Sequence, residues 1–477
     1  MAALDGAAPA TKGRRRALDP KPRFKDERHT QLDAIHGCPE LALADDHVAR
    51  GVWSLVQEFD LSEVEAQYSS LGRRGFPPRR LLALWIYASL VGEHHASKVA
   101  RRCETDMAMR WLCGGNCPAE RTVRRFRKTN AALFETALVK TVELAHEQGL
   151  LDFEDLAGDS ARLRAHAATD QVRTKKRSRE RLAELEAEDL REATEQHKQL
   201  IEDKRRKHQL ALKLCEEQNR SNVVLTNPAA GLMKFPHGAS LPGHRLSVMV
   251  SGVSSRFVIG VLVDASTHDY GKVEELTDKT IELLSKVDGL EYDKLNAVFD
   301  AGYATARDFE YLEQSQVLEG VIAPPPNRTS RNGTFNRDHF VILDNAPPRC
   351  PAGQPMQGPY TRPSGEEEWI GVGCADCELR LQCTKGKVRK LLINRPLERA
   401  RARFRDPEVK KRYNRRVATV EPVFSSIEDV MRFRRLSSRH PDTVYAELLL
   451  KVLAHNVSRL LHSSRLEILW ISFWPTL

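Results

Sequence analysis

Three acidic residues stand in short sequence contexts that suit metal ligands. Asp159 lies in LAGDSARLRAHA, Asp300 in LNAVFDAGYAT and Glu421 in VATVEPVFSSIEDVMRFRR. Each of them alone would more often be a solvated charge or a helix cap, because the chain contains 65 Asp and Glu residues. Together they predict a site for Mg²⁺ or Mn²⁺, since hard cations take carboxylate oxygens and two such ions can cleave a phosphodiester.

The elements expected around these residues would bring the carboxylates together. We expect a strand over residues 153–165, which contains Asp159, and a short apolar strand over 295–299 that ends directly before Asp300. Pro422 follows Glu421, and proline is tolerated in the first turn of a helix, so Glu421 is expected at a helix start or kink. Acids at the ends of two neighbouring strands and on a packed helix would form one metal site.

The surrounding sequence alternates strands and helices. We expect a β-hairpin over 245–264, helices over 272–287 and 304–314, a strand over 318–323 and a last long helix over 442–462. A sheet with interspersed helices and an acid at a strand end is typical of an α/β fold.

The length and charge of the chain point to several units and a polyanionic partner. A chain of 477 residues is expected to fold as two to four units. Its formal charge is +9, with basic clusters over 73–128 and 385–416, and this balance favours nucleic acid. We see neither a secretion signal nor an apolar run of about 20 residues, so we expect a cytoplasmic, nucleoid-associated protein with no membrane partner.

The N-terminal part reads as a basic tail and a helical domain. Residues 1–30 are expected to be disordered, and residues 31–150 to form short helices. Pro118 and Glu120 before TVRRFR resemble the turn and second helix of a helix-turn-helix, although an ordinary surface helix with a solvated basic face is the alternative. The residues expected to contact double-stranded DNA from this helix are Thr122, Arg124, Arg125 and Arg127.

Two segments read as insertions into a catalytic domain that spans residues 151–324 and 394–463. Residues 171–222 are charged and almost free of Gly and Pro, and their weak heptad pattern favours a helical arm or hairpin over a dimer zipper. Residues 325–393 are rich in Pro and Cys and are expected to be irregular. The apolar tail, 464–477, could pack in a surface groove or remain poorly ordered.

Four of the nine cysteines fall in the second insertion. They form the pattern C-x23-C-x2-C-x5-C, and four thiolates with one close pair can hold Zn²⁺ in a tetrahedron. The alternative is four reduced cysteines in a loop. The pattern predicts a structural zinc site, because an irregular segment gains most from a folding metal. The predicted ligands are Cys350, Cys374, Cys377 and Cys383.

Several separate segments resemble one family in the same order. The stretch FPPRRLLALWIYASLVGEHHASKVARRCETDMAMRWLCGG resembles the InsH-like N-terminal domain of bacterial insertion-sequence transposases. GDSARLRAHA and VFDAGYAT are similar to the segments with the two catalytic aspartates of that family, and RYNRRVATVEPVF to the segment with its glutamate. The resemblance runs from about residue 30 to residue 463 and matches Asp159, Asp300 and Glu421 to the catalytic triad.

The resemblance implies a fold and an activity. The fold is α/β, with an RNase H-like catalytic core, an N-terminal all-helical DNA-binding domain, a long helical insertion and an irregular cysteine-containing insertion. The activity is that of a DDE transposase, which nicks element ends hydrolytically and joins the freed 3′-hydroxyl to target DNA. The family also implies a homo-oligomer assembled on paired DNA ends.

The sequence departs from the family pattern near the glutamate. A Lys commonly lies seven residues after it, whereas this chain has Glu428 there, which would repel a phosphate. The Tyr and Arg of the family are represented by Tyr413, Arg415 and Arg416, offset by one residue. Arg432 could take the role of the Lys, and we expect Arg415, Arg416 and Arg432 to contact DNA.

Two rival functions follow from this departure. The chain could be an inactive, domesticated transposase that binds element ends without cutting them. It could also be a metal-dependent nuclease that does not join strands. Intact binding without metal-dependent cleavage would favour the first rival, and strand-transfer products would exclude the second.

Overall fold

The computed structural model describes residues 23–32, 37–68, 74–188, 191, 193–235, 238–327 and 334–463. The expectation for the tail, residues 464–477, and most of that for residues 1–30 lie outside these ranges. No helix in the described ranges combines the length and the apolar character that a membrane span requires.

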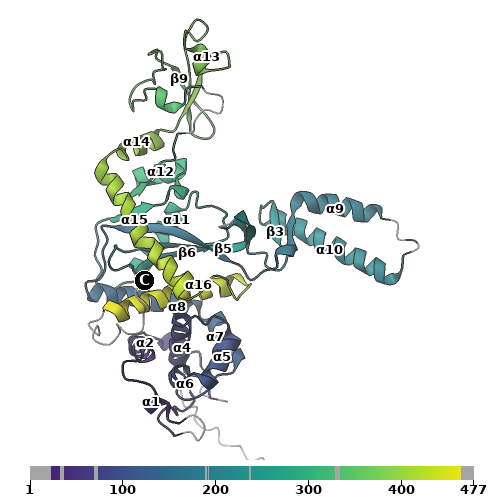
Figure 1. Cartoon of the computed structure of the whole chain (residues 1–477), viewed down its shortest axis with the longest axis vertical. Helices are drawn as coiled ribbons and strands as arrows, with labels where there is room; N and C mark the ends of the chain where they lie inside the picture. The colour runs from purple at the N-terminus through teal and green to yellow at the C-terminus, as the bar shows by residue number, and fades with distance from the viewer. Residues whose placement is uncertain are drawn as a thin grey trace, which may run out of the picture.

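A mixed sheet forms the centre of the molecule (Figure 1). The strand order is β5-β1-β7-β8, and β4 and β6 pair with different stretches of the free edge of β5. β1, β7 and β8 are parallel, whereas β5 is antiparallel to β1 and to β6, an arrangement consistent with an RNase H-like core. The strands are β1 (Leu156–Arg164), β4 (Gly231–Lys234), β5 (Ser240–Val250), β6 (Val258–Asp264), β7 (Leu295–Phe299) and β8 (Leu318–Ile322).

Helices cover this sheet. Gly260 on β6 faces α11 so closely that a Cβ there would lie 2.0 Å from Thr280 Oγ1, which explains a glycine in the strand. A long helix, α15, crosses the strands β1, β7 and β8 (Figure 1). The helices of this part are α11 (Val273–Leu284), α12 (Ala306–Gln314), α14 (Arg395–Arg403), α15 (Pro407–Ser425) and α16 (Pro441–Ser463).

The N-terminal helices share one apolar core with the sheet. The helix α16, expected in the catalytic domain, runs among α2, α4, α7 and α8 and also contacts β6. Asn456 joins these layers, because its side chain bonds both Val258 N and Val258 O at 2.9 Å and donates to Thr141 Oγ1. The N-terminal helices are α1 (Pro39–Ala42), α2 (Val48–Gln57), α3 (Ser62–Glu65), α4 (Pro78–Leu90), α5 (Ala96–Thr105), α6 (Met107–Leu112), α7 (Glu120–Thr129) and α8 (Ala131–Glu147).

The segment 171–222 forms a projecting arm (Figure 1). Its helices α9 (Lys175–Ala187) and α10 (Glu195–Glu217) pack against each other as a hairpin. At the base of the arm, β2 (Val172–Thr174) pairs with β3 (Asn222–Val224), which closes the insertion where it leaves the core.

The cysteine-containing segment is not irregular, as its composition predicted. β9 (Gln357–Thr361), β10 (Glu367–Ile370) and β11 (Lys390–Ile393) form an antiparallel sheet, with a short helix, α13 (Arg380–Cys383). A small separate core supports them, built around Phe340, Trp369 and Ile393. The high proline content was misleading because most of the prolines precede β9, and the two others lie within the edge strand β9 (Pro359) and in the turn after it (Pro363), where no proline interrupts the central strand.

Candidate functional site

The two predicted aspartates lie side by side on adjacent parallel strands, but only Asp300 follows a strand end: Asp159 lies in the middle of β1, just after the stretch that pairs with β7. Gly158 on β1 is in register with Phe299 on β7, so Asp159 and Asp300 follow side by side. A Cβ on Gly158 would lie 2.4 Å from the Phe299 ring, so only glycine allows this close approach of the strands. Asp300 caps the short 3₁₀ turn that follows β7, and its Oδ2 accepts a hydrogen bond from Gly302 N at 3.1 Å. The paired backbones of β1 and β7 therefore bring the two residues together.

Arg416 on α15 bridges the two aspartates. Its Nη1 forms an ion pair with Asp159 Oδ2, and its Nη2 lies 3.1 Å from Asp300 Oδ1. The Arg416 and Asp159 side chains are 10% and 19% exposed, whereas Asp300 is 39% exposed, so the cluster is buried on the side of Asp159 and open to solvent at Asp300. The contact differs from the expectation that Arg416 binds DNA, because its guanidinium points at the carboxylates. The space between the two aspartates is thus suited to a cation.

Burial raises the pKa of the Asp159 carboxyl to about 6, the Arg416 guanidinium opposes this rise, and the nearby Asp300 and Asp269 carboxylates add to it. A metal ion must displace the proton that this group holds below that pH. We therefore expect the affinity for Mn²⁺ to fall about tenfold per pH unit below pH 6 and to level off above it. Isothermal titration of the DNA-free protein between pH 5 and 8 would measure this, and a flat profile would contradict it.

Glu421 lies within α15, which begins at Pro407, so it is not at a helix start. Pro422 stands inside the helix and cannot donate to the carbonyl of Ala418; instead Arg256 Nε donates to that carbonyl at 3.1 Å. The helix then continues as a π-helical turn, Ser426–Val430. Glu421 is exposed, one and a half turns beyond Arg416 on the same helix.

The carboxylates do not form a closed metal site as they stand. Within the ranges that the structure describes, no three His, Cys, Asp or Glu side chains are gathered closely enough to hold a metal ion. The structure brings Asp159 and Asp300 together around a cation and leaves Glu421 outside that contact. The donors nevertheless suit Mg²⁺, because all are carboxylate oxygens and Mg²⁺ usually takes only one or two of them plus substrate oxygens.

A fourth carboxylate, Asp269, stands beside this pair. Its Oδ1 accepts from Ser160 Oγ and from Arg245 Nη1, and a Cβ on Gly302 would lie 3.4 Å from its Oδ2. This added Cβ would also lie 3.2 Å from Asp300 Oδ2, so the Asp269 and Asp300 carboxylates approach the same point. In the sequence, Asp269 follows an expected strand and could equally be a helix cap. Only the fold shows that it accepts a hydrogen bond from Ser160, the residue next to Asp159.

Arg415 and Arg432, the other basic residues expected near Glu421, differ from each other in their surroundings. Arg415 pairs with Asp155 at 2.6 Å and is half exposed. Arg432 is exposed and has a positive φ of 55°. Glu428, in the π-helical turn, is half-buried, and its pKa is raised by burial and by the adjacent Asp429 carboxylate. Neither Arg415 nor Arg432 places its charge between the two aspartates, because Arg416 occupies that position.

One predicted DNA contact is wrong. Arg127 is 4% exposed and donates to His94 O, Ser437 Oγ and Ser438 Oγ, and it pairs with the buried Glu447. It therefore ties α7 to α16 instead of facing DNA. The burial of Arg127 was not predicted because this residue belongs to a run of basic residues. In the helix it lies one turn after the buried Val123, on the same face.

Replacing Arg127 with alanine is expected to destabilise the protein by about 3 kcal/mol, because the Glu447 carboxylate would remain buried without its partner. Urea denaturation would measure the loss. A stability unchanged within 0.5 kcal/mol, taken here as roughly the scatter typical of surface substitutions, would contradict this assignment, as would a selective loss of DNA affinity.

The remaining predicted contacts on α7 reach the surface. Arg124 and Arg125 are exposed and Thr122 is half-buried. Arg124 pairs with Glu120 one turn earlier, whereas Thr122 and Arg125 line a hollow beside the helix.

The four cysteines of the small sheet domain line one cavity of about 540 Å³. All four are free thiols. They do not converge into a set that could hold a metal ion, so the arrangement does not reproduce the tetrahedron that the spacing suggests. Zinc binding at Cys350, Cys374, Cys377 and Cys383 remains a prediction.

Two family models match the chain in regions that carry this architecture. A Transposase domain model (DUF772) matches residues 40–129, which cover nearly all of α1 to α7. A Transposase DDE domain model matches residues 349–461, which include Arg416 and Glu421 but neither Asp159 nor Asp300. The two matches support an insertion-sequence DDE transposase. No curated protein matches it.

The two matches indicate the general activity of this chain. Transposases act on DNA, and a DDE domain indicates an enzyme of the nuclease and strand-transfer type. The family as a whole normally uses a divalent metal. The matches do not extend over Asp159 or Asp300, so the assignment of these residues rests on the sheet geometry and on the sequence resemblance.

Proposed function

We propose that this transposase cuts the ends of an insertion sequence and joins them to target DNA at a site formed by Asp159, Asp300 and Glu421. The observation that carries the proposal is the pair of aspartates on the adjacent parallel strand β1 and directly after β7, which contact one cation, Arg416. Two metal ions held there would activate the attacking oxygen and neutralise the leaving one. The chain's own residues would supply the carboxylate oxygens, with Glu421 approaching from α15.

DNA is the proposed partner along the basic surfaces of the protein. The formal charge of +9 favours duplex binding with a strong salt dependence. The predicted contacts that remain accessible in the fold are Thr122, Arg124, Arg125, Arg415 and Arg432, of which Arg124 and Arg415 are paired with carboxylates. We further propose that two or more copies assemble on paired element ends in the bacterial cytoplasm, as the family pattern implies.

A second candidate function is end binding without cleavage, and Glu428 is the observation that favours it. Its carboxylate and that of Asp429 put negative charge next to the region where the family pattern has a Lys. A phosphate of the DNA would be repelled there. In this second candidate function the protein has the same fold and still binds DNA, but it does not cleave or join DNA.

Replacing Glu428 with lysine is expected to strengthen binding to end DNA and to steepen its salt dependence. One new phosphate contact changes the slope of log K against log salt by about 0.9. Fluorescence anisotropy at several salt concentrations would measure it, with Glu408→Lys, an exposed position at the start of the same helical segment, as the control. Equal slopes for the two variants would contradict a role of position 428 in DNA contact.

A joining assay separates the three candidates. Purified protein would be incubated with Mg²⁺, a DNA fragment that carries the native flanks of its own gene, and a supercoiled target plasmid. A transposase gives target molecules covalently joined to the flank 3′ ends. Cleavage without joined products would indicate a nuclease, and binding without cleavage would indicate an end-binding protein.

A further inference from the structure

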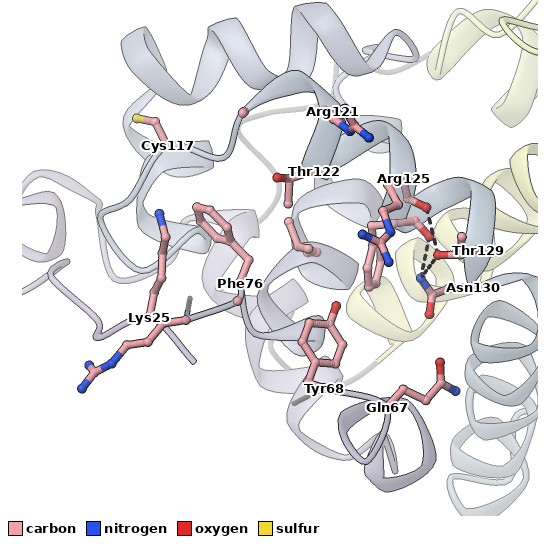
Figure 2. A pocket seen from close by; sticks show the side chains of 15 residues that line it. Lys25, Gln67, Tyr68, Phe76, Cys117, Arg121, Thr122, Arg125, Thr129 and Asn130 are labelled. Atoms are coloured by element: carbon pink, nitrogen blue, oxygen red, sulfur yellow. Dashed lines mark hydrogen bonds between the residues drawn. The ribbon is translucent and has the colours of Figure 1, made fainter. Parts of the chain in front are cut away.

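A hollow of about 650 Å³ lies beside α7 in the N-terminal helical region (Figure 2). Side chains of α7, of the end of α3 and its following turn, and of the segment before α4 surround it. Figure 2 shows Tyr68, Phe76 and Arg125 around this space. The lining residues used below are Lys25, Tyr68, Arg74, Phe76, Arg121 and Arg125.

Every charged residue that lines the hollow is basic. Arg121 and Arg125 stand one turn apart on one face of α7, and both are exposed. Within the described ranges neither has an acidic partner within ion-pair distance, whereas Arg74 pairs with Asp26. Two unpaired guanidinium groups on one helix face would attract a phosphate group.

Aromatic rings form the other wall of the hollow. Tyr68, Phe76 and Phe126 line it, but Phe76 and Phe126 are only 8% and 3% exposed, and Lys25 Nζ lies 4.4 Å from the centre of the Phe76 ring. Tyr68 is half-buried, and the ring of Phe24 packs edge-on against it with centroids 5.3 Å apart. Tyr68 is therefore the ring of this wall on which the flat face of a nucleobase can stack.

The concave shape does not suit the docking expected for a recognition helix. A helix that enters the major groove projects from its surroundings, whereas the Arg121–Arg125 face of α7 borders a depression. In a paired duplex the base faces are stacked on one another and cannot reach an aromatic wall. An unpaired or extruded base can, while its phosphate remains near the arginines.

We propose that this hollow binds one unpaired nucleotide of a DNA strand, with the base against Tyr68 and the phosphate near Arg121 and Arg125. The inference rests on the proposed function for its DNA partner. It adds a site for a distorted or single-stranded position of the DNA, away from the carboxylates that would carry the chemistry. Thr122 and Asn130 stand in the same lining and offer polar groups to the base edge.

The test compares two labelled duplexes of the same sequence, one fully paired and one with a single unpaired 2-aminopurine nucleotide. Binding is measured by anisotropy in EDTA, so that no cleavage occurs, together with the quenching of 2-aminopurine fluorescence. The protein is expected to prefer the duplex with the unpaired base by about tenfold and to quench its fluorescence, because stacking of one base contributes on that scale.

The variants assign this preference to the hollow. Tyr68→Ala, at a half-buried position, and Arg125→Ala are expected to lose most of the preference, whereas Arg101→Ala on the exposed face of α5 removes the same charge and should keep it. Thermal melting shows that each variant is folded. Equal affinity for both duplexes, or equal behaviour of Tyr68→Ala and Arg101→Ala, would overturn the proposal. Because metal is absent, these outcomes do not depend on whether the protein cleaves DNA.

Discussion

Replacing Asp300 with alanine is expected to reduce metal-dependent cleavage of flank DNA by about 10³-fold or more while leaving DNA affinity within about twofold. Asp300 stands at the end of β7, beside Asp159 on β1, and supplies one of two carboxylates that face the same space. Losing even one preorganised electrostatic contact in an active site costs about 10²–10³-fold in rate. A metal ligand should cost at least as much.

A control with a matched change of charge makes this result interpretable. Asp278 is an exposed aspartate on α11 of the same domain, and Asp278→Ala removes one carboxylate without touching the strand ends. It should cleave like the unaltered protein. If Asp300→Ala retained cleavage comparable to that of Asp278→Ala, Asp159 and Asp300 would not be the catalytic residues.

Replacing Arg416 with alanine is expected to destabilise the metal-free protein by about 3 kcal/mol, because two facing carboxylates would lose their shared cation in a largely buried place. Divalent metal should then restore much of the loss, since a cation that binds only the folded protein stabilises it. The melting temperature of Arg416→Ala should therefore rise more with Mn²⁺ than that of the unaltered protein. Differential scanning fluorimetry with and without Mn²⁺ would measure both effects.

Arg415 provides the matched control for this experiment. It is adjacent in sequence, has the same charge and also pairs with an aspartate, Asp155, but its side chain is 51% exposed. An exposed pair contributes about 0–1 kcal/mol, so Arg415→Ala should melt close to the unaltered protein and respond to Mn²⁺ as that protein does. An equal metal response of Arg415→Ala and Arg416→Ala would show that the place between the aspartates does not attract a cation.

The strands with their aspartates could be predicted from the sequence because the relevant pattern is local. Apolar runs that end in an acid, such as LNAVF before Asp300, indicate a buried strand and its polar end without reference to the rest of the chain. The hairpin over 245–264 is local in the same way, since its two strands are separated by a short turn. The parallel register that sets Asp159 beside Asp300 is not local.

The role of Arg416 could not be predicted, because its partners are more than a hundred residues away in sequence. In a basic run such as RYNRRVATVE, an arginine that faces carboxylates and one that faces solvent look alike. Arg127 illustrates the same limit, since its partner Glu447 comes from the last helix. The small sheet around the cysteines was missed because its strands are only four or five residues long and follow a proline-rich stretch.

Metal-dependent cleavage tests the central claim most directly. The protein would be incubated with DNA that carries the native flanks of its own gene, first with Mg²⁺ and then with EDTA, and the ends would be mapped on a sequencing gel. We predict breaks at fixed flank positions with Mg²⁺ and none with EDTA or in Asp300→Ala. Flank-specific binding without breaks in Mg²⁺ or Mn²⁺ would contradict the account and leave an end-binding protein.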